Sequence, residues 1–114
     1  MSARTGQEDI TGLKARPRAV WIDGPRVEDM VIHPALHSGV QFVAALYDIR
    51  HEPELRGDMT YASPTTGGPG GRSFMVPQTV EDLERRLNMM TRWAWASCGM
   101  MSRSPDFRNV IFAA

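Results

Sequence analysis

Apolar residues in two long stretches of the chain recur every three or four positions, which is the spacing of one face of an α-helix. The first stretch opens at His33-Pro34 and runs to Arg50, and its apolar face consists of Leu36, Val40, Val43 and Tyr47. The second follows Thr79, and its apolar face consists of Leu83, Leu87, Met90, Ala94 and Cys98. Proline suits the first turn of a helix, threonine is a good amino-terminal cap, and Gly99 is a natural stop signal. The pattern predicts two amphipathic helices.

Two shorter helices are predicted nearer the ends of the chain. Thr5 and Glu8 have the spacing of a capping box, and the helix that they open, residues 6–14, is expected to stop before Pro17. The Ser104-Pro105 pair starts another helix. The apolar stripe of this last helix consists of Phe107, Val110, Ile111 and Ala114. The chain ends within the stripe and without a capping residue, so we expect the fold to continue in a longer polypeptide.

Brief β-prone runs between turn residues predict one or two small hairpins in a mainly α fold. The first pairs residues 19–22 with residues 26–27 around an Asp-Gly-Pro turn. The second has strands at 59–62 and 72–76. The intervening residues, 63–71, are rich in glycine and proline and are expected to form a flexible connection. The chain has 114 residues and no evident linker, so we expect one domain.

The composition narrows the choice of partners. Thirteen basic residues balance thirteen acidic ones, and a neutral chain without a basic block attracts nucleic acid or anionic membranes only weakly. No apolar run approaches the roughly 20 residues that cross a bilayer, and the first residues lack the apolar core of a secretory signal. The single cysteine fits a reducing compartment. We therefore expect a cytoplasmic protein that binds neither nucleic acid nor membrane.

The motifs within the chain give little support to nucleotide or metal chemistry. Residues 67–71 have the glycines of a phosphate loop, but such a loop needs a following lysine and a helix, whereas a β-prone run follows here. His33 and His37 have the spacing of a metal pair on a helix, yet His33 precedes the helix and no third ligand stands at motif spacing. We expect no metal, and we expect His51 also to be a cap or a surface residue. Cys98 is expected to be a packed, inert thiol on the apolar face of its helix.

Two further features leave alternatives open. A patch rich in sulfur and aromatic rings is formed by Met89, Met90, Trp93, Trp95, Met100 and Met101. It is either a buried interface, which composition favours, or one wall of a pocket for an aromatic substrate. Arg103 stands just before the Ser104 cap, where a helix amino terminus and a permanent cation together favour an oxyanion. The alternative is that Arg103 pairs with a carboxylate such as that of Asp106.

Five segments, in order along nearly the whole chain, resemble the large oxygenase component of the 4-hydroxyphenylacetate 3-hydroxylase family. They are residues 19–29 followed by His33-Pro34, 45–54, 59–67, 72–86 and 99–110. The last segment, GMMSRSPDFRNV, is the most diagnostic. Matches in order over most of a chain are far more specific than one short motif. On this resemblance the chain is identified as a member of the family.

The resemblance implies the amino-terminal helical domain of an acyl-CoA dehydrogenase-like fold, here residues 1–114, truncated before a central β-barrel and a carboxy-terminal helix bundle. Such proteins assemble as tetramers and take reduced FAD (FADH2) from a separate flavin reductase. The flavin reacts with oxygen, and the enzyme hydroxylates the carbon ortho to a phenolic hydroxyl, which gives a catechol. The family's catalytic histidine and its flavin-contacting segments fall beyond Ala114. This chain alone is therefore expected to bind flavin weakly or not at all and to be inactive.

The resemblance also assigns roles to two residues. Arg103 matches the family arginine that contacts the phenolic oxygen, so it is expected to bind the substrate and to act in catalysis, because a cation favours the electron-rich phenolate. Phe107 is expected to line the same substrate site, where the hydroxyphenylacetate hydroxylases carry a tyrosine whose hydroxyl also holds that oxygen. Loss of this hydrogen bond in a dry site costs about 1–3 kcal/mol, so the identity of the phenol is left open. Ser102 replaces the usual glycine, which is a milder departure.

Two alternatives to a phenol hydroxylase remain. A 4-hydroxybutyryl-CoA dehydratase-type flavoprotein of the same superfamily would need cysteine and histidine ligands for an iron–sulfur cluster, and this chain has one cysteine. A truncated, non-catalytic helical module would be revealed by a stop codon directly after Ala114 in the coding DNA.

Overall fold

The computed structural model describes residues 3–100 of the chain, and these residues are mainly helical, as predicted. The elements, in which η marks a 3-10 helix, are α1 (Gly6–Ala15), α2 (Pro34–Asp48), η1 (Ile49–His51), α3 (Arg56–Met59), β1 (Thr60–Ala62), β2 (Pro69–Gly71), η2 (Arg72–Phe74) and α4 (Val80–Ala96). The two strands pair antiparallel, with Tyr61 opposite Gly70. Within residues 3–100, no helix is long and apolar enough to cross a membrane.

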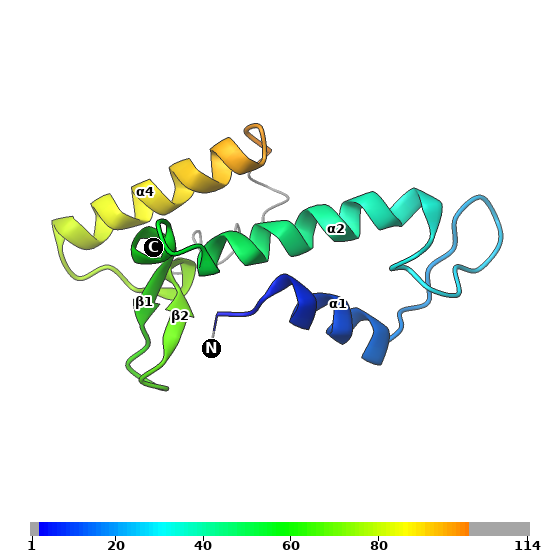
Figure 1. The fold of residues 1–114 in the computed structure, drawn as a ribbon, viewed down its shortest axis with the longest axis horizontal. Helices are drawn as coiled ribbons and strands as arrows, with labels where there is room; N and C mark the ends of the chain where they lie inside the picture. The colour runs from blue at the N-terminus through cyan, green and yellow to red at the C-terminus, as the bar shows by residue number, and fades with distance from the viewer. Residues whose placement is uncertain (1–2, 101–114) are drawn as a thin grey trace.

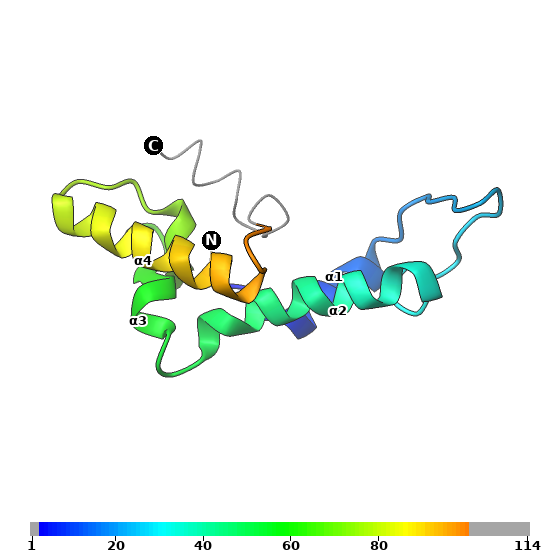
Figure 2. The ribbon, with the colours of Figure 1, turned by 90° about the horizontal axis from the view of Figure 1, so that it is seen from above.

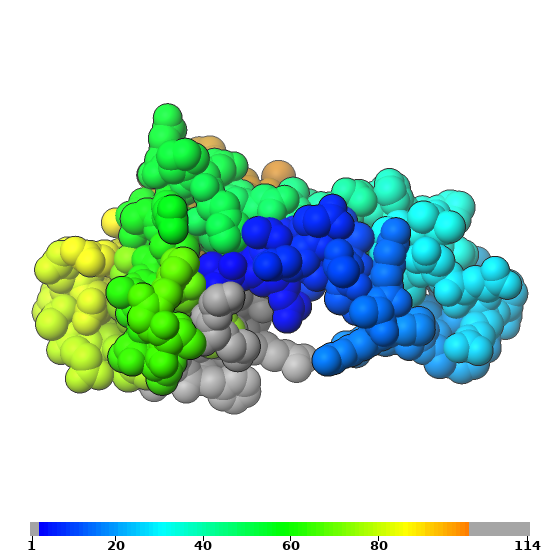
Figure 3. Space-filling view, turned by 60° about the horizontal axis from the view of Figure 1, so that its bottom comes forward, coloured from blue at the N-terminus to red at the C-terminus, as the bar shows by residue number. Residues whose placement is uncertain are grey.

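The long helix α2 runs through the middle of an elongated molecule that measures 51 × 30 × 27 Å. α1 lies along one side of α2, and α4 lies on the other side (Figures 1 and 2). The β1–β2 hairpin projects from the end of the molecule where α3 packs on α4 (Figure 1). In the space-filling view, α1 lies against the body between this hairpin and the loop that leads into α2 (Figure 3).

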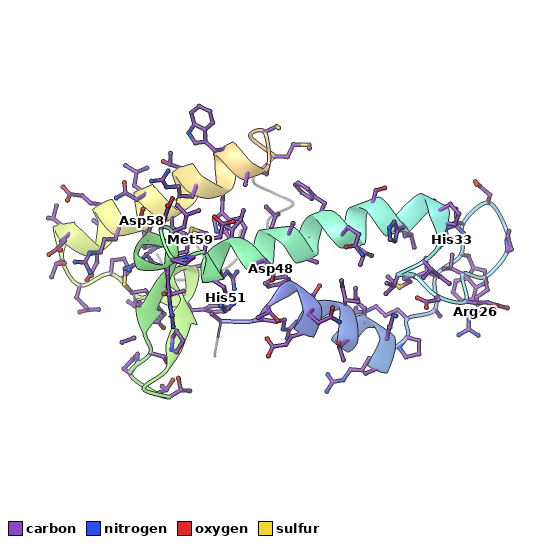
Figure 4. The ribbon with its side chains drawn as sticks, viewed as in Figure 1. Arg26, His33, Asp48, His51, Asp58 and Met59 are labelled. Carbon is purple, nitrogen blue, oxygen red and sulfur yellow. The ribbon has the colours of Figure 1, made fainter. Side chains whose placement is uncertain are left out.

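The core lies where α2, α3 and α4 meet. Four side chains there are almost completely buried: Leu46, Met59, Met89 and Trp93. Five partly buried residues pack around them: Phe42, Ile49, Leu55, Met90 and Ala96. Met59 is labelled at this junction in Figure 4. Full burial of one such side chain contributes about 1.5–3 kcal/mol, so these contacts hold α4 against the end of α2.

The capping box predicted for α1 is present. The Thr5 hydroxyl accepts the Glu8 backbone N–H at 3.2 Å, and the Glu8 carboxylate accepts the Thr5 backbone N–H at 2.8 Å. α1 also approaches α2 closely at Gly6, where a methyl group in place of the glycine hydrogen would collide with the Ala44 carbonyl oxygen. Glycine is therefore required at this position by the packing of the two helices, since any side chain would clash with the backbone of α2.

The second capping threonine, Thr79, also behaves as predicted. Its hydroxyl accepts the Asp82 backbone N–H at 3.1 Å. The Asp82 carboxylate in turn accepts the backbone N–H groups of Gln78 at 3.0 Å and Thr79 at 3.2 Å. These hydrogen bonds stabilise the ionised carboxylate and lower the pKa of Asp82, first through Gln78 and then through Thr79. The amino terminus of α4 is thus fixed by a complete capping box.

Of the apolar stripe predicted on α4, Met90 packs against the core, but the fully buried residues lie on a neighbouring face. Leu83 and Leu87 are 54% and 62% exposed, whereas Met89 and Trp93 are buried. Since successive helical residues are about 100° apart, the two faces are separated by roughly a quarter turn or slightly more. The junction of α2 and α3 selects the second face because that face carries the large Trp93 ring, which fills the core.

Cys98 is exposed, so the prediction of a packed thiol is wrong. The helix ends at Ala96, and the Cys98 backbone is left-handed, with φ of 52°. This backbone rotates the side chain away from the direction that continued helical spacing would give it. Periodicity placed Cys98 on the apolar face only because it assumed that the helix continues two residues past Ala96.

The predicted hairpins are only partly confirmed. The first is reduced to a single antiparallel bridge between Trp21 and Arg26, closed through Asp23 and Gly24, which both have positive φ. β1 falls within the predicted strand 59–62.

The other strand of the second hairpin was predicted at residues 72–76, and this prediction is wrong. β2 lies in the glycine-rich segment at Pro69–Gly71, and Arg72–Phe74 form a 3-10 helix instead. The physical reason is the Arg72 side chain, which is buried because it donates to carbonyl oxygens of α3 and β1. To reach them, the chain turns at Arg72 where a strand would continue. The glycine-rich segment therefore leads into a short 3-10 helix and not into an α-helix, so it lacks the geometry of a phosphate loop.

Candidate functional site

The carboxyl end of α4 leads directly into the most diagnostic sequence segment, residues 99–110. The helix ends there in a Schellman turn: Gly99 N–H donates to the Ala94 carbonyl at 2.8 Å, and Cys98 N–H donates to the Trp95 carbonyl at 3.4 Å. Gly99 has φ of 82°, which confirms its predicted role as a stop signal. Cys98, also left-handed, occupies the position that glycine usually takes in this motif.

Buried side chains hold this helix end against the rest of the molecule. The Ser97 side chain is buried, and its hydroxyl donates to the Trp93 carbonyl at 2.7 Å. The buried Arg50 guanidinium lies 5.5 Å from the centre of the Trp93 ring and 5.1 Å from that of Tyr47. Such cation–π contacts are worth more when they are shielded from water. They connect the end of α2 to the last turns of α4, so the segment after Gly99 starts from a well-fixed point.

Both predicted site residues, Arg103 and Phe107, lie outside the described residues, as does Met101. Their roles remain predictions. The described residue nearest to them along the sequence is Met100, whose side chain is 47% exposed and whose N–H donates to the Ser97 carbonyl at 3.0 Å. The structure shows the anchored end of α4 at Ala96, and Arg103 follows seven positions later in the sequence.

The predicted sulfur and aromatic patch is divided in the structure. Met89 and Trp93 belong to the buried core, whereas Trp95 is 81% exposed. Trp95 lines an open, mostly apolar hollow of about 440 Å³ together with Ala94 and Cys98. Of its described residues, Met89, Met90 and Trp93 belong to or pack on the core, whereas Trp95 and Met100 are exposed near the turn that ends α4.

The three histidines are a helix cap and two exposed residues, as predicted. His33 caps α2, because its Nδ1 accepts the Ala35 backbone N–H at 3.3 Å. His37 Nδ1 is 2.8 Å from the Val31 carbonyl oxygen, and His51 Nε2 is 3.3 Å from that of Arg4. Among residues 3–100, no three histidine, cysteine, aspartate or glutamate side chains are grouped so as to hold a metal ion.

The sequence analysis missed a structural role for Arg72. Its side chain is buried and donates to three carbonyl oxygens, those of Gly57, Asp58 and Thr60, at 2.6–2.7 Å. Burial lowers the pKa of Arg72, and the nearby charge of Arg85 lowers it further. An arginine after two glycines carries no pattern that predicts burial, since this role depends on carbonyl groups that the fold brings together.

Comparison with known proteins places the chain in a family. A family model described as "4-hydroxyphenylacetate 3-hydroxylase N terminal" matches residues 5–114. The oxygenase component of 4-hydroxyphenylacetate 3-monooxygenase from Thermus thermophilus is 45% identical over 112 residues, which are 98% of this chain and 23% of that protein. A monooxygenase from Streptomyces globisporus, named for a (3S)-3-amino-3-(3-chloro-4-hydroxyphenyl)propanoyl group on a peptidyl-carrier protein, is 39% identical over 106 residues, 91% of this chain and 20% of the relative.

A solved structure shows the same fold. It is a crystal structure of the oxygenase component of 4-hydroxyphenylacetate 3-monooxygenase complexed with FAD and 4-hydroxyphenylacetate, and it matches with a TM-score of 0.84 at 46% identity, over 91% of this chain and 21% of that one. These proteins have an acyl-CoA dehydrogenase-like fold, so the predicted fold class is confirmed. The chain spans between a fifth and a quarter of the length of the relatives that it matches. It belongs to the 4-hydroxyphenylacetate 3-hydroxylase family, in which it corresponds to the amino-terminal part of the oxygenase component.

Proposed function

We propose that this chain is part of a two-component, flavin-dependent monooxygenase that hydroxylates a phenol at the ortho position to give a catechol. The observation that carries the proposal is the family match over residues 5–114, accompanied by the same fold in a relative bound to FAD and 4-hydroxyphenylacetate. Both curated relatives described above are monooxygenases. That supports an oxygenase over the dehydratase-type alternative.

In this proposal Arg103 holds the phenolic oxygen of the substrate. A guanidinium beside a phenol stabilises the phenolate and lowers the pKa of the phenol. Phenolate is the more electron-rich ring, so it accepts electrophilic oxygen more readily at the ortho carbon. The anchoring of α4 through Trp93 and Ser97 supports such a role, because catalytic groups work best on rigid supports.

Phe107 bears on the choice of phenol. A phenylalanine beside the phenolic oxygen cannot donate the hydrogen bond that a tyrosine would, which weakens the hold on a simple phenol by about 1–3 kcal/mol. The relative from Streptomyces globisporus is named for a chlorinated hydroxyphenyl group on a carrier protein. We therefore include substituted phenols, beside 4-hydroxyphenylacetate, in the proposed substrate class.

FAD is part of the proposal, and the residues that contact it are expected beyond Ala114. The glycine-rich segment forms a turn and a strand and leads into a 3-10 helix, so it does not have the loop and α-helix of a dinucleotide-binding motif. The apolar hollow between α1 and α2, about 380 Å³, has one charged residue, Asp9, which repels anions. When bound elsewhere in the enzyme, reduced flavin supplies the activation of oxygen.

The remaining parts of the proposal are what membership of the family implies. We infer that residues 1–114 are the amino-terminal helical domain of a cytoplasmic enzyme whose β-barrel and carboxy-terminal helix bundle complete the flavin site. A tetrameric assembly and a separate flavin reductase belong to the same proposal. The family's catalytic histidine is expected outside this chain, beyond Ala114.

A chimera tests the proposed function. Residues 1–114 replace the matching segment of the Thermus thermophilus oxygenase, and the chimera is supplied with a flavin reductase, FAD and oxygen. We expect catechol formation from a phenol, and no product from the same oxygenase with this segment deleted. A chimera that folds and takes up FAD, yet hydroxylates neither 4-hydroxyphenylacetate nor chlorinated phenols, would contradict the proposal. The 114-residue chain alone is expected to form no catechol.

A further inference from the structure

An open cavity of about 610 Å³ lies beside the β1–β2 hairpin, and the proposed oxygenase chemistry makes no use of it. Its walls come from α3, from both strands of the hairpin, from η2 and from α4. Three arginines line it, Arg56, Arg72 and Arg85, and none of the described residues that line it is an aspartate or a glutamate. A chain without net charge therefore concentrates three positive charges around one hollow.

Arg72 supplies a fixed charge at the buried side of the cavity. Nε donates to the Asp58 carbonyl at 2.7 Å, and Nη2 donates to the carbonyls of Gly57 at 2.7 Å and Thr60 at 2.6 Å. The third nitrogen, Nη1, contacts the weak acceptor Met75 Sδ at 3.5 Å. These contacts orient the guanidinium before any ligand arrives, which reduces the entropy lost on binding.

Arg56 and Arg85 supply two more exposed charges. Among residues 3–100, the Arg56 guanidinium has no ion pair or hydrogen bond. Arg85 pairs with Glu81, but both side chains are at least half exposed, so this pair is weak in water. Arg85 is also close enough to Arg72 to lower its pKa, after the larger effect of burial. The like charges repel each other while the cavity holds no anion.

The acidic groups that could neutralise these arginines are held by other partners. The Asp58 carboxylate lies 3.7 Å from Arg92, at the junction of α3 and α4 (Figure 4). The Asp82 carboxylate accepts two backbone N–H groups at the amino-terminal cap of α4. Both carboxylates act on Arg72 from a distance, yet neither lines the cavity. The positive charge inside the hollow is therefore available to a ligand.

We propose that this cavity binds a phosphate group, either free phosphate or the phosphate of a small ester. Guanidinium groups donate two parallel hydrogen bonds to phosphate oxygens. A group with about two negative charges also gains more from three cations than a singly charged carboxylate does. Arg56 and Arg85 contact the phosphate from the exposed side, and Arg72 adds its field from the buried side. The proposal is independent of the oxygenase function.

The test is a titration of the 114-residue chain with inorganic phosphate at low ionic strength, followed by calorimetry. Arg56→Gln and Arg85→Gln are the informative variants, because both side chains are exposed and their loss leaves the core intact. We expect each to weaken phosphate binding about five- to tenfold, as for the loss of one charge-assisted contact. Arg26→Gln is the matched control, since Arg26 is exposed at the opposite end of the molecule (Figure 4), and we expect unchanged affinity.

A second measurement is the melting temperature with and without phosphate. Phosphate is expected to raise it, because binding to the folded state alone stabilises that state, and each cavity variant is expected to reduce the rise. Titration with glycerol phosphate distinguishes an ester from free phosphate as the preferred source. The proposal is overturned if the wild-type chain shows no saturable binding in the millimolar range, if acetate binds as well as phosphate, or if Arg26→Gln weakens binding as much as the cavity variants do.

Discussion

The backbone N–H of Gly6 donates to the Asp48 carboxylate at 2.8 Å, joining the first residue of α1 to the last residue of α2. The two residues are 42 positions apart in the sequence. The contact places a negative charge at the amino terminus of α1, where the helix dipole favours it. In Figure 4 the labelled Asp48 lies on α2 beside the first turn of α1.

Two glycine substitutions in α1 are expected to have opposite effects. Gly6→Ala drives a methyl group into the Ala44 carbonyl oxygen, so it should lower the free energy of unfolding by about 1–3 kcal/mol. Gly12→Ala meets nothing within 4 Å and should raise it by about 0.5–1 kcal/mol. Urea unfolding of both variants checks this. Equal effects would show that α1 does not pack on α2 as described.

Cys98→Gly is expected to stabilise the chain. Cys98 has φ of 52° at the Schellman position where glycine carries no steric cost, so the substitution should raise the free energy of unfolding by up to about 1 kcal/mol. Cys98→Ala is the control, because alanine keeps the left-handed strain while removing the thiol. A gain of the same size from alanine would assign the effect to the sulfur and not to the backbone.

The Asp82 carboxylate at the amino terminus of α4 makes the free energy of unfolding depend on pH in acid. The Asp82 pKa is lowered from its ordinary value of 3.8 in the folded state by the backbone N–H groups of Gln78 and Thr79. The unfolded chain therefore binds this proton at a higher pH than the folded chain does. The stabilisation from Asp82 is complete above about pH 5, well above the unfolded-state pKa, and is lost as the pH falls through the lower, folded-state pKa.

Urea unfolding from pH 6 down to pH 2 measures this loss, with Asp82→Asn beside the parent chain. The asparagine variant should lose less stability on acidification, because it has no carboxylate to protonate at the cap. Glu81→Gln, one residue away on the exposed surface, serves as the control for general charge effects. If the parent and Asp82→Asn lose the same stability on acidification, protonation of Asp82 does not contribute to that loss.

Arg103→Ala, made in the active chimera, is expected to lower catechol yield by tenfold or more, in line with the loss of a charged contact to the reacting oxygen. Oxygen consumption should continue, with more hydrogen peroxide released, because the flavin reacts without a positioned phenol. Product and peroxide are measured in the same assay. Unchanged hydroxylation would show that Arg103 has a structural role, such as a pair with Asp106.

Phe107→Tyr is expected to improve the use of simple para-substituted phenols. A restored hydroxyl near the phenolic oxygen adds one hydrogen bond, worth about 1–3 kcal/mol in a dry site. The gain should appear as a lower KM for 4-hydroxyphenylacetate, with a smaller change for chlorinated phenols. A loss of activity toward every phenol would argue against a position in the substrate pocket.

Local sequence determines much of the secondary structure. Both capping boxes, the proline start of α2 and the Gly99 stop depend on side chains within a few residues of the backbone groups that they satisfy. Such contacts do not depend on the tertiary fold, so they can be predicted from the spacing of residues alone. The order of motifs along the chain, which carried the family assignment, is likewise a property of the sequence.

Tertiary structure decided which faces and which polar groups are buried. Which face of α4 is buried depends on the surface that α2 and α3 form around Trp93. Periodicity within α4 alone could not predict that face. The 3-10 turn at Arg72 depends on carbonyl oxygens up to 15 residues away. Likewise, glycine is required at position 6 by a helix that begins 28 positions later in the sequence. Long-range contacts of this kind have no local pattern, because they exist only once the chain has folded.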